Sequence, residues 1–242
     1  MSKALPPLVG IDGCRAGWIA VISFPEQSPF VKVFADFASI LAALPDDAIL
    51  AVDMPVGLPD FVRAGGRGPE QAVRPLLGER QSSVFSIPSR AAVRASDYGQ
   101  ACALSLETSD PPRKVSRQAF NLFPKIREID DLITGDLSRR LFEVHPEVAF
   151  WRLNGERAMR LPKKIKGKIN PAGMVERIQL LEAHGIPASV TGAKPPRGAA
   201  QDDLLDACAC LAIASRIALG MARPFPDPPL TDPNGITIAI WA

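Results

Sequence analysis

Apolar residues near the start of the chain come in short runs that are typical of three strands. Residues 8–12 and 18–24 are largely apolar, and Gly13 and Gly17 permit positive φ in the turn between them. This pattern predicts a β-hairpin. Residues 30–35 predict a third strand that follows the hairpin.

The next segment predicts a helix and then a buried strand. Residues 36–44 have the spacing of an amphipathic helix, which Asp36 caps and Pro45 ends. Residues 48–52 are continuously apolar and are followed by Asp53. A strand without polar positions needs cover on both faces of its sheet. We therefore expect an α/β protein in which helices flank a mixed sheet.

The rest of the chain carries a long helical segment and then further strand and helix signals. Residues 60–139 contain short helical patches without a convincing strand, which indicates a helical insertion. A strand is expected at 140–151, followed by a basic loop and an amphipathic helix within 160–186. Residues 201–222 give the strongest helix signal. A proline-rich linker then precedes a short terminal strand at 236–241.

Length and composition indicate one folded domain, 1–242, that carries the insertion. The net charge of +2 is too small to make the whole molecule a polyanion binder. The sequence contains no run of about 18 apolar residues and no signal-peptide core, so we expect a cytoplasmic protein without a membrane span. The four cysteines include no CxxC pair and are expected to be reduced structural thiols.

Five aspartates are placed so that their carboxylates can meet. Asp12 and Asp53 each end an apolar strand, so on neighbouring strands both side chains emerge at the same edge of the sheet. At about 100° per residue, the last helix places Asp202, Asp203 and Asp206 in one sector that can face this edge. Caps are the alternative: Asp202 and Asp203 can cap the helix, and the two strand-end aspartates can cap turns.

Converging carboxylates need a neutralising partner. Two unit charges about 4 Å apart repel by about 4 kcal/mol at an effective dielectric of about 20. A proton on one carboxyl group relieves this repulsion, and a divalent cation relieves it better where three or four oxygens meet. Hard carboxylate ligands favour Mg²⁺ or Mn²⁺. Two such ions about 3.5–4 Å apart can support phosphodiester hydrolysis.

Six motifs, spread from about residue 8 to residue 240, together resemble a known family. They read GIDGCRAGW, AVDMPVGLP, LGERQSSVFSIPSR, SRQAFNLFPKIREID, FEVHPEVAFW and DDLLDA, in this order. The set is similar to domain of unknown function family 429, whose members are described as predicted ribonuclease-H-like nucleases. The resemblance implies a ribonuclease-H-like fold with a mixed five-stranded sheet, in which the first three strands are antiparallel and helices cover both faces.

The resemblance also implies an acidic catalytic centre. Asp12 matches the first-strand aspartate, and Asp53 matches the carboxylate after the fourth strand. Asp203 and Asp206 match the pair on the final helix, where DLLDACA is similar to Holliday-junction resolvases. Ribonuclease H itself takes its second acid from a helix, so Asp53 is carried over only from the resolvase-like branch.

The motif FEVHPE supplies further candidates. Glu143 and Glu147 match the family pattern and are expected on the strand after the insertion, with Glu143 as an additional metal ligand. His145, between them, has an ordinary pKa near 6.5 that suits a general base beside a metal-bound water. The alternative is a hydrogen-bonded structural histidine.

Basic and hydroxyl residues indicate where phosphates would bind. Residues 152–168 carry seven lysines and arginines against one acid, so Lys164 in this run is expected to contact a nucleic-acid backbone. Ordinary solvated loops are the alternative for the run and for the motif ERQSSVFSIPSR. Four residues of that motif are candidates for phosphate contacts through a guanidinium fork or a hydroxyl group: Arg80, Ser82, Ser83 and Arg90.

The hypothesis that joins these observations is a nuclease that uses Mg²⁺ or Mn²⁺ to hydrolyse phosphodiester bonds, with nucleic acid as its partner. A non-catalytic protein that binds nucleic acid or another protein on the same scaffold is the first alternative. An actin-like ATP-binding phosphotransferase is the second, because DGCRAG loosely matches the phosphate-binding hairpin of those proteins. The chain has no second hairpin motif of that kind, which disfavours it.

Overall fold

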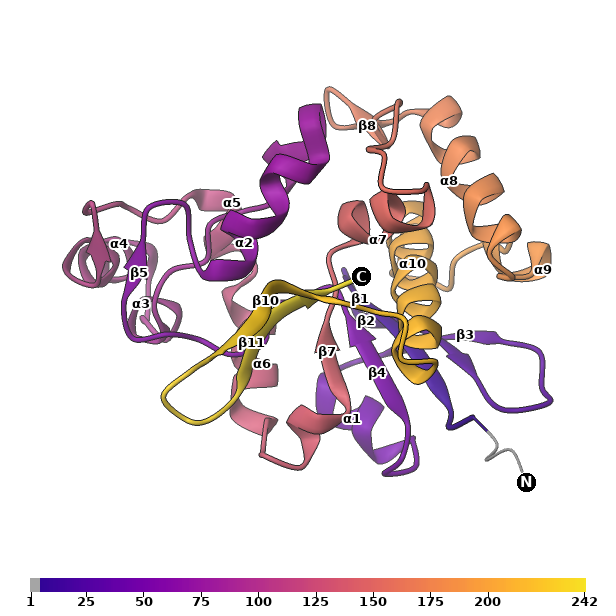
Figure 1. Cartoon of the computed structure of the whole chain (residues 1–242), viewed down its shortest axis with the longest axis horizontal. Helices are drawn as coiled ribbons and strands as arrows, with labels where there is room; N and C mark the ends of the chain where they lie inside the picture. The colour runs from indigo at the N-terminus through magenta and orange to yellow at the C-terminus, as the bar shows by residue number, and fades with distance from the viewer. Residues whose placement is uncertain (1–4) are drawn as a thin grey trace.

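A seven-stranded mixed sheet forms the centre of the computed structural model, which describes residues 5–242 (Figure 1). Residues 1–4 of the predicted domain lie outside the described residues. The strand order is β10-β11-β7-β4-β1-β2-β3. The strands are β1 (Leu8–Cys14), β2 (Gly17–Ser23), β3 (Phe30–Phe34), β4 (Ile49–Val52), β7 (Leu141–Glu143), β10 (Pro224–Thr231) and β11 (Thr237–Trp241).

The first three strands form an antiparallel meander, as the sequence predicts. β4 then pairs with β1 in parallel, and β7 pairs with β4 in parallel, so three strands run in the same direction at the centre of the sheet. All three of these strands have their carboxyl ends at one edge. The α/β class is therefore confirmed, with the antiparallel strands to one side of the parallel centre.

The sheet has seven strands, so the expectation of five was wrong. The C-terminal segment explains the difference, because β10 and β11 form an antiparallel hairpin that joins the sheet through β11 and β7. The sequence reads residues 224–231 as a proline-rich linker, since this strand holds four prolines. A strand at the edge of a sheet tolerates proline because one side of its backbone needs no ladder hydrogen bonds.

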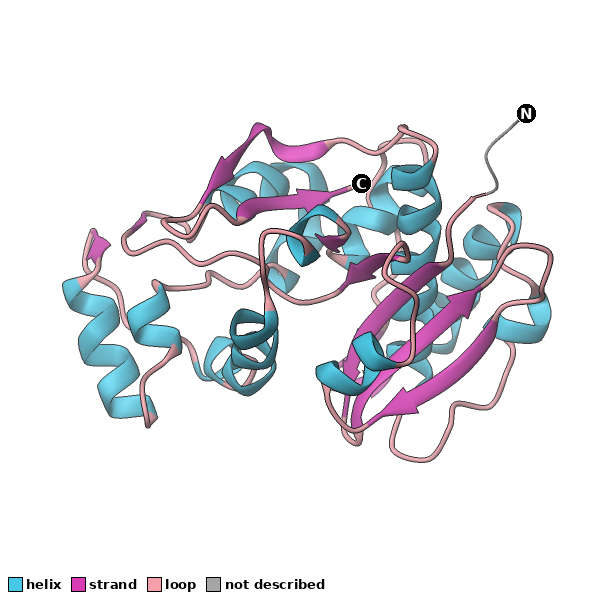
Figure 2. Ribbon diagram, turned by 90° about the horizontal axis from the view of Figure 1, so that it is seen from below, coloured by secondary structure: helices cyan, strands magenta, loops and turns pink. Residues whose placement is uncertain are grey.

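Helices cover both faces of the sheet (Figure 2). The longest helix, α10, packs with α7 and α8 on one face, and α1, α4 and α6 pack on the other. The helices are α1 (Phe37–Ala42), α2 (Gly68–Val73), α3 (Arg90–Val93), α4 (Tyr98–Glu107), α5 (Arg117–Phe120), α6 (Phe123–Leu132), α7 (Pro146–Leu153), α8 (Pro171–Ala183), α9 (Ala188–Thr191) and α10 (Gln201–Ala218), with the 3₁₀ helices η1 (Arg74–Ser83) and η2 (Leu137–Arg139).

The segment 60–139 is mainly helical, as expected, but it also holds strand pairing that the sequence does not reveal. β5 (Val62–Arg63) pairs in parallel with β6 (Ser109–Asp110). Each strand has only two residues, which is too short for a period of two to appear in the sequence. In Figure 1 the helices α3 and α4 of this segment lie at the far left.

The predicted strand 140–151 was wrong over most of its length. Only the three residues of β7 are extended, and α7 begins immediately afterwards with Pro146 in its first turn. Proline favours that position because the first backbone N–H groups of a helix have no partner within the helix. Glu147 therefore lies on a helix and not on a strand.

Three other predicted elements agree more closely with the structure. Helix α1 is capped by Asp36, whose Oδ1 accepts the backbone N–H of Ser39 at 2.7 Å. Helix α10 ends four residues before the predicted boundary of 222. The amphipathic helix expected within 160–186 is α8, and the basic loop predicted before it holds a small hairpin made of β8 (Lys164–Ile165) and β9 (Lys168–Ile169). Across residues 5–242, none of the helices combines the length and apolar character that a membrane crossing requires.

Candidate metal centre

Two of the predicted carboxylates come from the carboxyl ends of the neighbouring parallel strands β1 and β4. Ile11 pairs with Val52, and the backbone N–H of Asp53 donates to the carbonyl oxygen of Ile11 at 2.9 Å. Asp12 and Asp53 each follow one of these paired residues, so they lie side by side. Alternate side chains of a strand point to opposite faces, which places both aspartates on the face that α10 covers.

The third carboxylate comes from α10 and depends on the absence of a side chain at Gly10. A Cβ built on Gly10 would lie 2.0 Å from the carbonyl oxygen of Ala207 and 2.2 Å from the backbone nitrogen of Leu211. Only glycine permits the helix backbone to approach β1 so closely. This close packing carries Asp206, the residue before Ala207, to the edge where the two strand-end aspartates lie.

The three aspartates form a compact cluster. One carboxylate oxygen from each of Asp12, Asp53 and Asp206 lies within 4.8 Å of the other two. Asp12 and Asp206 are buried and Asp53 is half-buried. Oxygens on opposite sides of a bound Mg²⁺ lie about 4 Å apart, and those around Ca²⁺ about 5 Å apart, so the spacing fits a divalent cation.

Burial and mutual repulsion raise the pKa values of these carboxyl groups. Burial and then the charge of Asp206 raise the pKa of Asp53 to about 8. Burial and then the charge of Asp53 raise the pKa of Asp12 well above its ordinary value, and burial likewise raises the pKa of Asp206. Without a cation, Asp53 therefore holds a proton at pH 7. A bound divalent cation would replace that proton and stabilise the ionised carboxylates.

Lys163 supplies a positive charge to the same cluster. Its Nζ forms an ion pair with Asp206 Oδ2. Burial lowers the pKa of Lys163, but the ion pair with Asp206 and the charges of Asp12 and Asp53 together outweigh burial, so the pKa is raised above its ordinary value. The other oxygen of this aspartate, Oδ1, is buried and has no hydrogen-bond partner among the described residues. The cluster thus keeps an unused acceptor that a cation could take.

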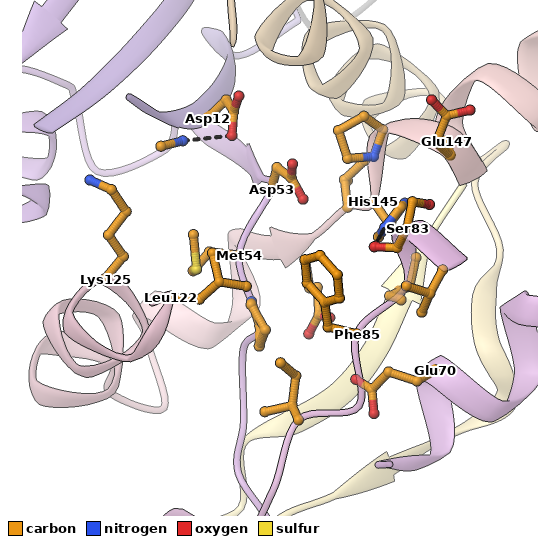
Figure 3. Close-up of a pocket in the computed structure, with 18 of the residues that line it drawn as sticks. Asp12, Asp53, Met54, Glu70, Ser83, Phe85, Leu122, Lys125, His145 and Glu147 are labelled. Atoms are coloured by element: carbon orange, nitrogen blue, oxygen red, sulfur yellow. Dashed lines mark hydrogen bonds between the residues drawn. The ribbon is translucent and has the colours of Figure 1, made fainter. Parts of the chain in front are cut away.

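The cluster opens into a cavity of about 350 Å³ (Figure 3). Asp12, Asp53 and Lys163 line one part of it, and Met54, Phe85 and Leu122 give it apolar walls. Figure 3 shows Asp12 with the hydrogen bond from the backbone N–H of Gly13 to its Oδ1, which is 2.6 Å long. A small polar group of a ligand therefore has room beside the carboxylates.

Asp203 and Asp202 stand apart from the cluster. Asp203 Oδ2 accepts the backbone N–H of Ala200 at 2.9 Å, so this side chain acts at the N-terminus of α10. Asp202 is buried and forms an ion pair with Lys164 at 2.5 Å. Of the two aspartates predicted as a pair on the last helix, Asp206 thus joins Asp12 and Asp53 in the cluster. A metal-binding role of Asp203 stays a prediction.

Glu143 lies on the opposite face of the sheet from the cluster. It pairs with Val52, one position before Asp53, and a shift of one residue along a strand reverses the side-chain direction. Its Oε1 accepts from Arg67 Nη2 at 2.6 Å, and its Oε2 accepts from the backbone N–H of Val56 at 2.8 Å. Burial raises the pKa of Glu143 to about 7, although the charge of Arg67 opposes this. Its role as an additional metal ligand stays a prediction.

The other two residues of FEVHPE also have partners or neighbours of their own. Glu147 accepts from Arg177 Nη2 at 2.6 Å, and both side chains are buried. His145 lines the cavity, and its Nε2 lies 3.3 Å from the carbonyl oxygen of Ser83. Burial lowers the pKa of His145, so the ring is neutral at pH 7 and keeps the capacity to accept a proton.

The predicted phosphate-binding residues are dispersed. Ser83 lines the cavity of the aspartate cluster, whereas Ser82 lines a second cavity next to it. Arg80 pairs with Glu79 at 3.0 Å, and Lys164 pairs with Asp202. Arg90 is engaged elsewhere, since its Nη2 binds Asp232 Oδ2 at 2.6 Å and Asp130 Oδ1 at 3.0 Å. The structure thus spreads these five residues over several places, and their phosphate contacts stay predictions.

Lys163 and Arg67 are the residues near the site that sequence reasoning missed. Lys163 belongs to the basic run, but its side chain is distinguished there only by the tertiary contact with Asp206. Arg67 binds both Glu70 and Glu143, and each of the three side chains is buried. Mutual repulsion among the aspartates was a usable signal for a nearby positive charge, and the ammonium of Lys163 supplies one.

The fold and the site define a mixed α/β protein with a buried cluster of three aspartates that could hold a divalent metal ion. Residues 10–231 match the model of the family described as protein of unknown function (DUF429), so the chain belongs to this family. A search of curated proteins and a search of solved structures each found no significant match.

Proposed function

We propose that this protein is a metal-dependent phosphodiesterase of the ribonuclease-H-like type that hydrolyses nucleic acid with Mg²⁺ or Mn²⁺. The observation that supports the proposal most strongly is the convergence of Asp12, Asp53 and Asp206, which come from two strands and a helix, beside a cavity. Clustering buried acids is costly for a fold. A bound cation gives a chemical reason for this arrangement.

Each residue of the site would have its own role in this reaction. The three aspartates hold and orient the cation, which when bound lowers the pKa of a water molecule and stabilises charge on the phosphate oxygens. Lys163 pairs with one of these carboxylates, and its ammonium can stabilise the negative charge that develops on a phosphate oxygen. His145 is neutral and lines the same cavity, so it can accept the proton of an attacking water molecule.

The experiment measures metal binding and cleavage on the same preparation. At a metal concentration about 100 times the Kd, stability rises by about 2.7 kcal/mol, which raises Tm by about 5–10 °C for a chain of this size. Labelled single-stranded, duplex and branched nucleic acids are then incubated with Mg²⁺ or Mn²⁺. Asp12→Asn is expected to abolish both the Tm rise and the cleavage.

Asp47→Asn is the matched control, because Asp47 is an exposed carboxylate just before β4, at the opposite end of that strand from Asp53. It should leave both readouts unchanged. Cleavage that persists in Asp12→Asn at the wild-type rate would show that the aspartate cluster is not the catalytic centre. Binding of nucleic acid without any metal-dependent cleavage or Tm rise would favour the second candidate below.

The second candidate is a non-catalytic protein that binds nucleic acid. The ion pair between Lys163 and Asp206 favours it, because a lysine already neutralises part of the cluster without a metal. In that case the aspartates and the lysine form a structural network, and the cavity beside them is a recognition site.

A further inference from the structure

A second cavity, of about 510 Å³, adjoins the cavity of the aspartate cluster. We call it the basic cavity. It is formed by the loop 62–66, by residues 81–88 and by the segment 105–118, all within the long helical segment. The two cavities share Val84, Phe85 and Ile87, so one short stretch of chain separates them.

The two cavities have opposite charge. The first is lined by five carboxylates and only two lysines. The basic cavity is lined by three arginines and a lysine, and none of the described residues that line it is acidic. Hydroxyl and amide side chains account for most of its other polar lining: Gln81, Ser82, Ser86, Ser105, Ser109, Ser116 and Gln118.

The basic side chains that line this cavity differ in what they contact. Arg74 builds the wall, since its guanidinium binds the carbonyl oxygens of Gly65 and Val84 and, at 2.8 Å, the hydroxyl of Ser86. Arg63 faces the exposed carboxylate of Asp110 at 3.9 Å, which offsets part of its charge.

Arg113 and Lys114 are different, because both are exposed at the rim of the cavity. Burial lowers the pKa of Arg74, the charge of Glu70 opposes this, and the like charge of Arg113 lowers the pKa slightly, because the two guanidinium groups lie near each other. A site of this kind is suited to an anion that approaches from solvent.

The dividing stretch offers a surface for a base. Ser82 lines the basic cavity and Ser83 lines the other, so consecutive residues face the two sites. Phe85 lines both cavities and is half-buried. In the view of Figure 3 it lies between Asp53 and Glu70. Aromatic side chains between phosphate-binding positions are how proteins hold single-stranded nucleic acid.

We propose that the basic cavity binds phosphates of a single-stranded nucleic acid whose reacting phosphodiester lies at the aspartate cluster, with Phe85 stacking on a base between the two positions. The position of the reacting bond rests on the proposed function. The substrate strand crosses the stretch 84–87, with its backbone charge drawn to Arg113 and Lys114. A duplex does not fit this path, because its bases are paired and cannot stack on a side chain.

The test measures binding by fluorescence anisotropy, in buffer with EDTA, so that no cleavage occurs. The probes are labelled single strands of about 12 nucleotides, as DNA and as RNA, and a duplex of the same length. The variant Arg113→Gln/Lys114→Gln should bind single strands about 20-fold more weakly at about 0.1 M salt. Its plot of log K against log salt should be shallower by about 1.4, the effect of two lost phosphate contacts.

The matched control removes two exposed lysines that line neither cavity, Lys32→Gln/Lys194→Gln. It should change single-strand binding by less than about twofold. Phe85→Leu keeps an apolar side chain but removes the ring, and it should weaken binding about tenfold with no change in the salt slope. The Tm of each variant shows whether it is folded.

Three outcomes would overturn the inference. One is equal weakening in the cavity variant and the control variant, which would mean that only overall charge matters. Another is binding of the duplex as tight as that of the single strand. The third is unchanged binding in the cavity variant, even if the wild-type protein cleaves with Mn²⁺. The absence of cleavage together with cavity-dependent binding would instead contradict the proposed function alone.

Discussion

The ammonium of Lys163 forms an ion pair with the carboxylate of Asp206, at the place where two further aspartates converge. The lysine comes from the segment just before β8 and the aspartate from α10, so the contact joins parts of the chain 43 residues apart. Among residues 5–242, Lys163 is the basic residue that forms an ion pair with this cluster. A metal ion that binds here must share these carboxylates with it.

We predict that Lys163→Met makes the metal-free protein less stable and its metal binding tighter. Removal of one partner of this partly buried ion pair costs up to about 3 kcal/mol, because the remaining charge loses its compensation. The same removal frees Asp206 for a cation. Urea unfolding in EDTA measures the first effect, and metal titration by calorimetry measures the second. Lys163→Arg, which keeps the charge, is the control; weaker metal binding in Lys163→Met would contradict the idea of competition.

A pair of variants on α10 separates the metal site from the helix cap. Asp206→Asn should weaken metal binding at least tenfold, equal to about 1.4 kcal/mol, because it removes one charged ligand. Asp203→Ala should leave the metal Kd within about twofold, but lower the free energy of unfolding by about 1 kcal/mol through loss of its hydrogen bond to Ala200. Equal losses of metal affinity would place Asp203 among the ligands, as the sequence resemblance implies.

The stability of the metal-free protein should fall as pH rises from about 4 to about 8. The pKa of Asp53 is raised to about 8 in the folded protein from an ordinary value of 3.8, so the folded state binds more protons in this range. Each pH unit then costs up to about 1.4 kcal/mol. Urea unfolding at several pH values in EDTA measures this slope, and Asp53→Asn should flatten it. Saturating metal should do the same, since the cation replaces the protons; an unchanged slope in either case would contradict the assignment.

Gly10→Ala should destabilise the protein by about 3 kcal/mol, at the upper end of overpacking, because the new methyl group meets the backbone of α10. Metal binding should weaken as well, because the methyl group pushes α10 away from β1 and thereby moves Asp206 away from Asp12. Gly135→Ala is the control: a Cβ on Gly135 meets nothing within 4 Å. Thermal unfolding and metal titration of both variants check this, and equal stability of the two variants would be the contrary result.

The parts of the site that follow local rules were predictable from the sequence. Asp12 lies near the end of β1, Asp53 directly follows β4, and Asp206 interrupts an apolar helix, so their convergence needed the parallel pairing of β1 and β4 and the packing of α10 against Gly10. The face on which Glu143 lies was not predictable, because it depends on a register between β4 and β7 that no local pattern encodes. Lys163 is one lysine among several in its run, and tertiary contacts alone distinguish it.

The elements of the fold also divide into those that local sequence rules predict and those that depend on tertiary contacts. Amphipathic spacing and the Asp36 cap located α1, and a continuous run of apolar and small residues after an acidic first turn located α10; in both, local and tertiary preferences agree. The helix α7 was mistaken for a strand because its sequence is almost wholly apolar, and burial on all sides removes the period that distinguishes the two structures. β10 was mistaken for a linker because its prolines are compatible with a strand only at the edge of a sheet.

The prolines of β10 leave that edge of the sheet with few backbone N–H donors. A residue without an amide hydrogen cannot donate to an incoming strand, so Pro224, Pro226, Pro228 and Pro229 make β10 a poor template for another chain. β3, at the far border, contains no proline and keeps its full set of amide donors. Self-association by adding strands to this sheet therefore has only the β3 edge available. This limits such assemblies to pairs instead of open-ended fibres.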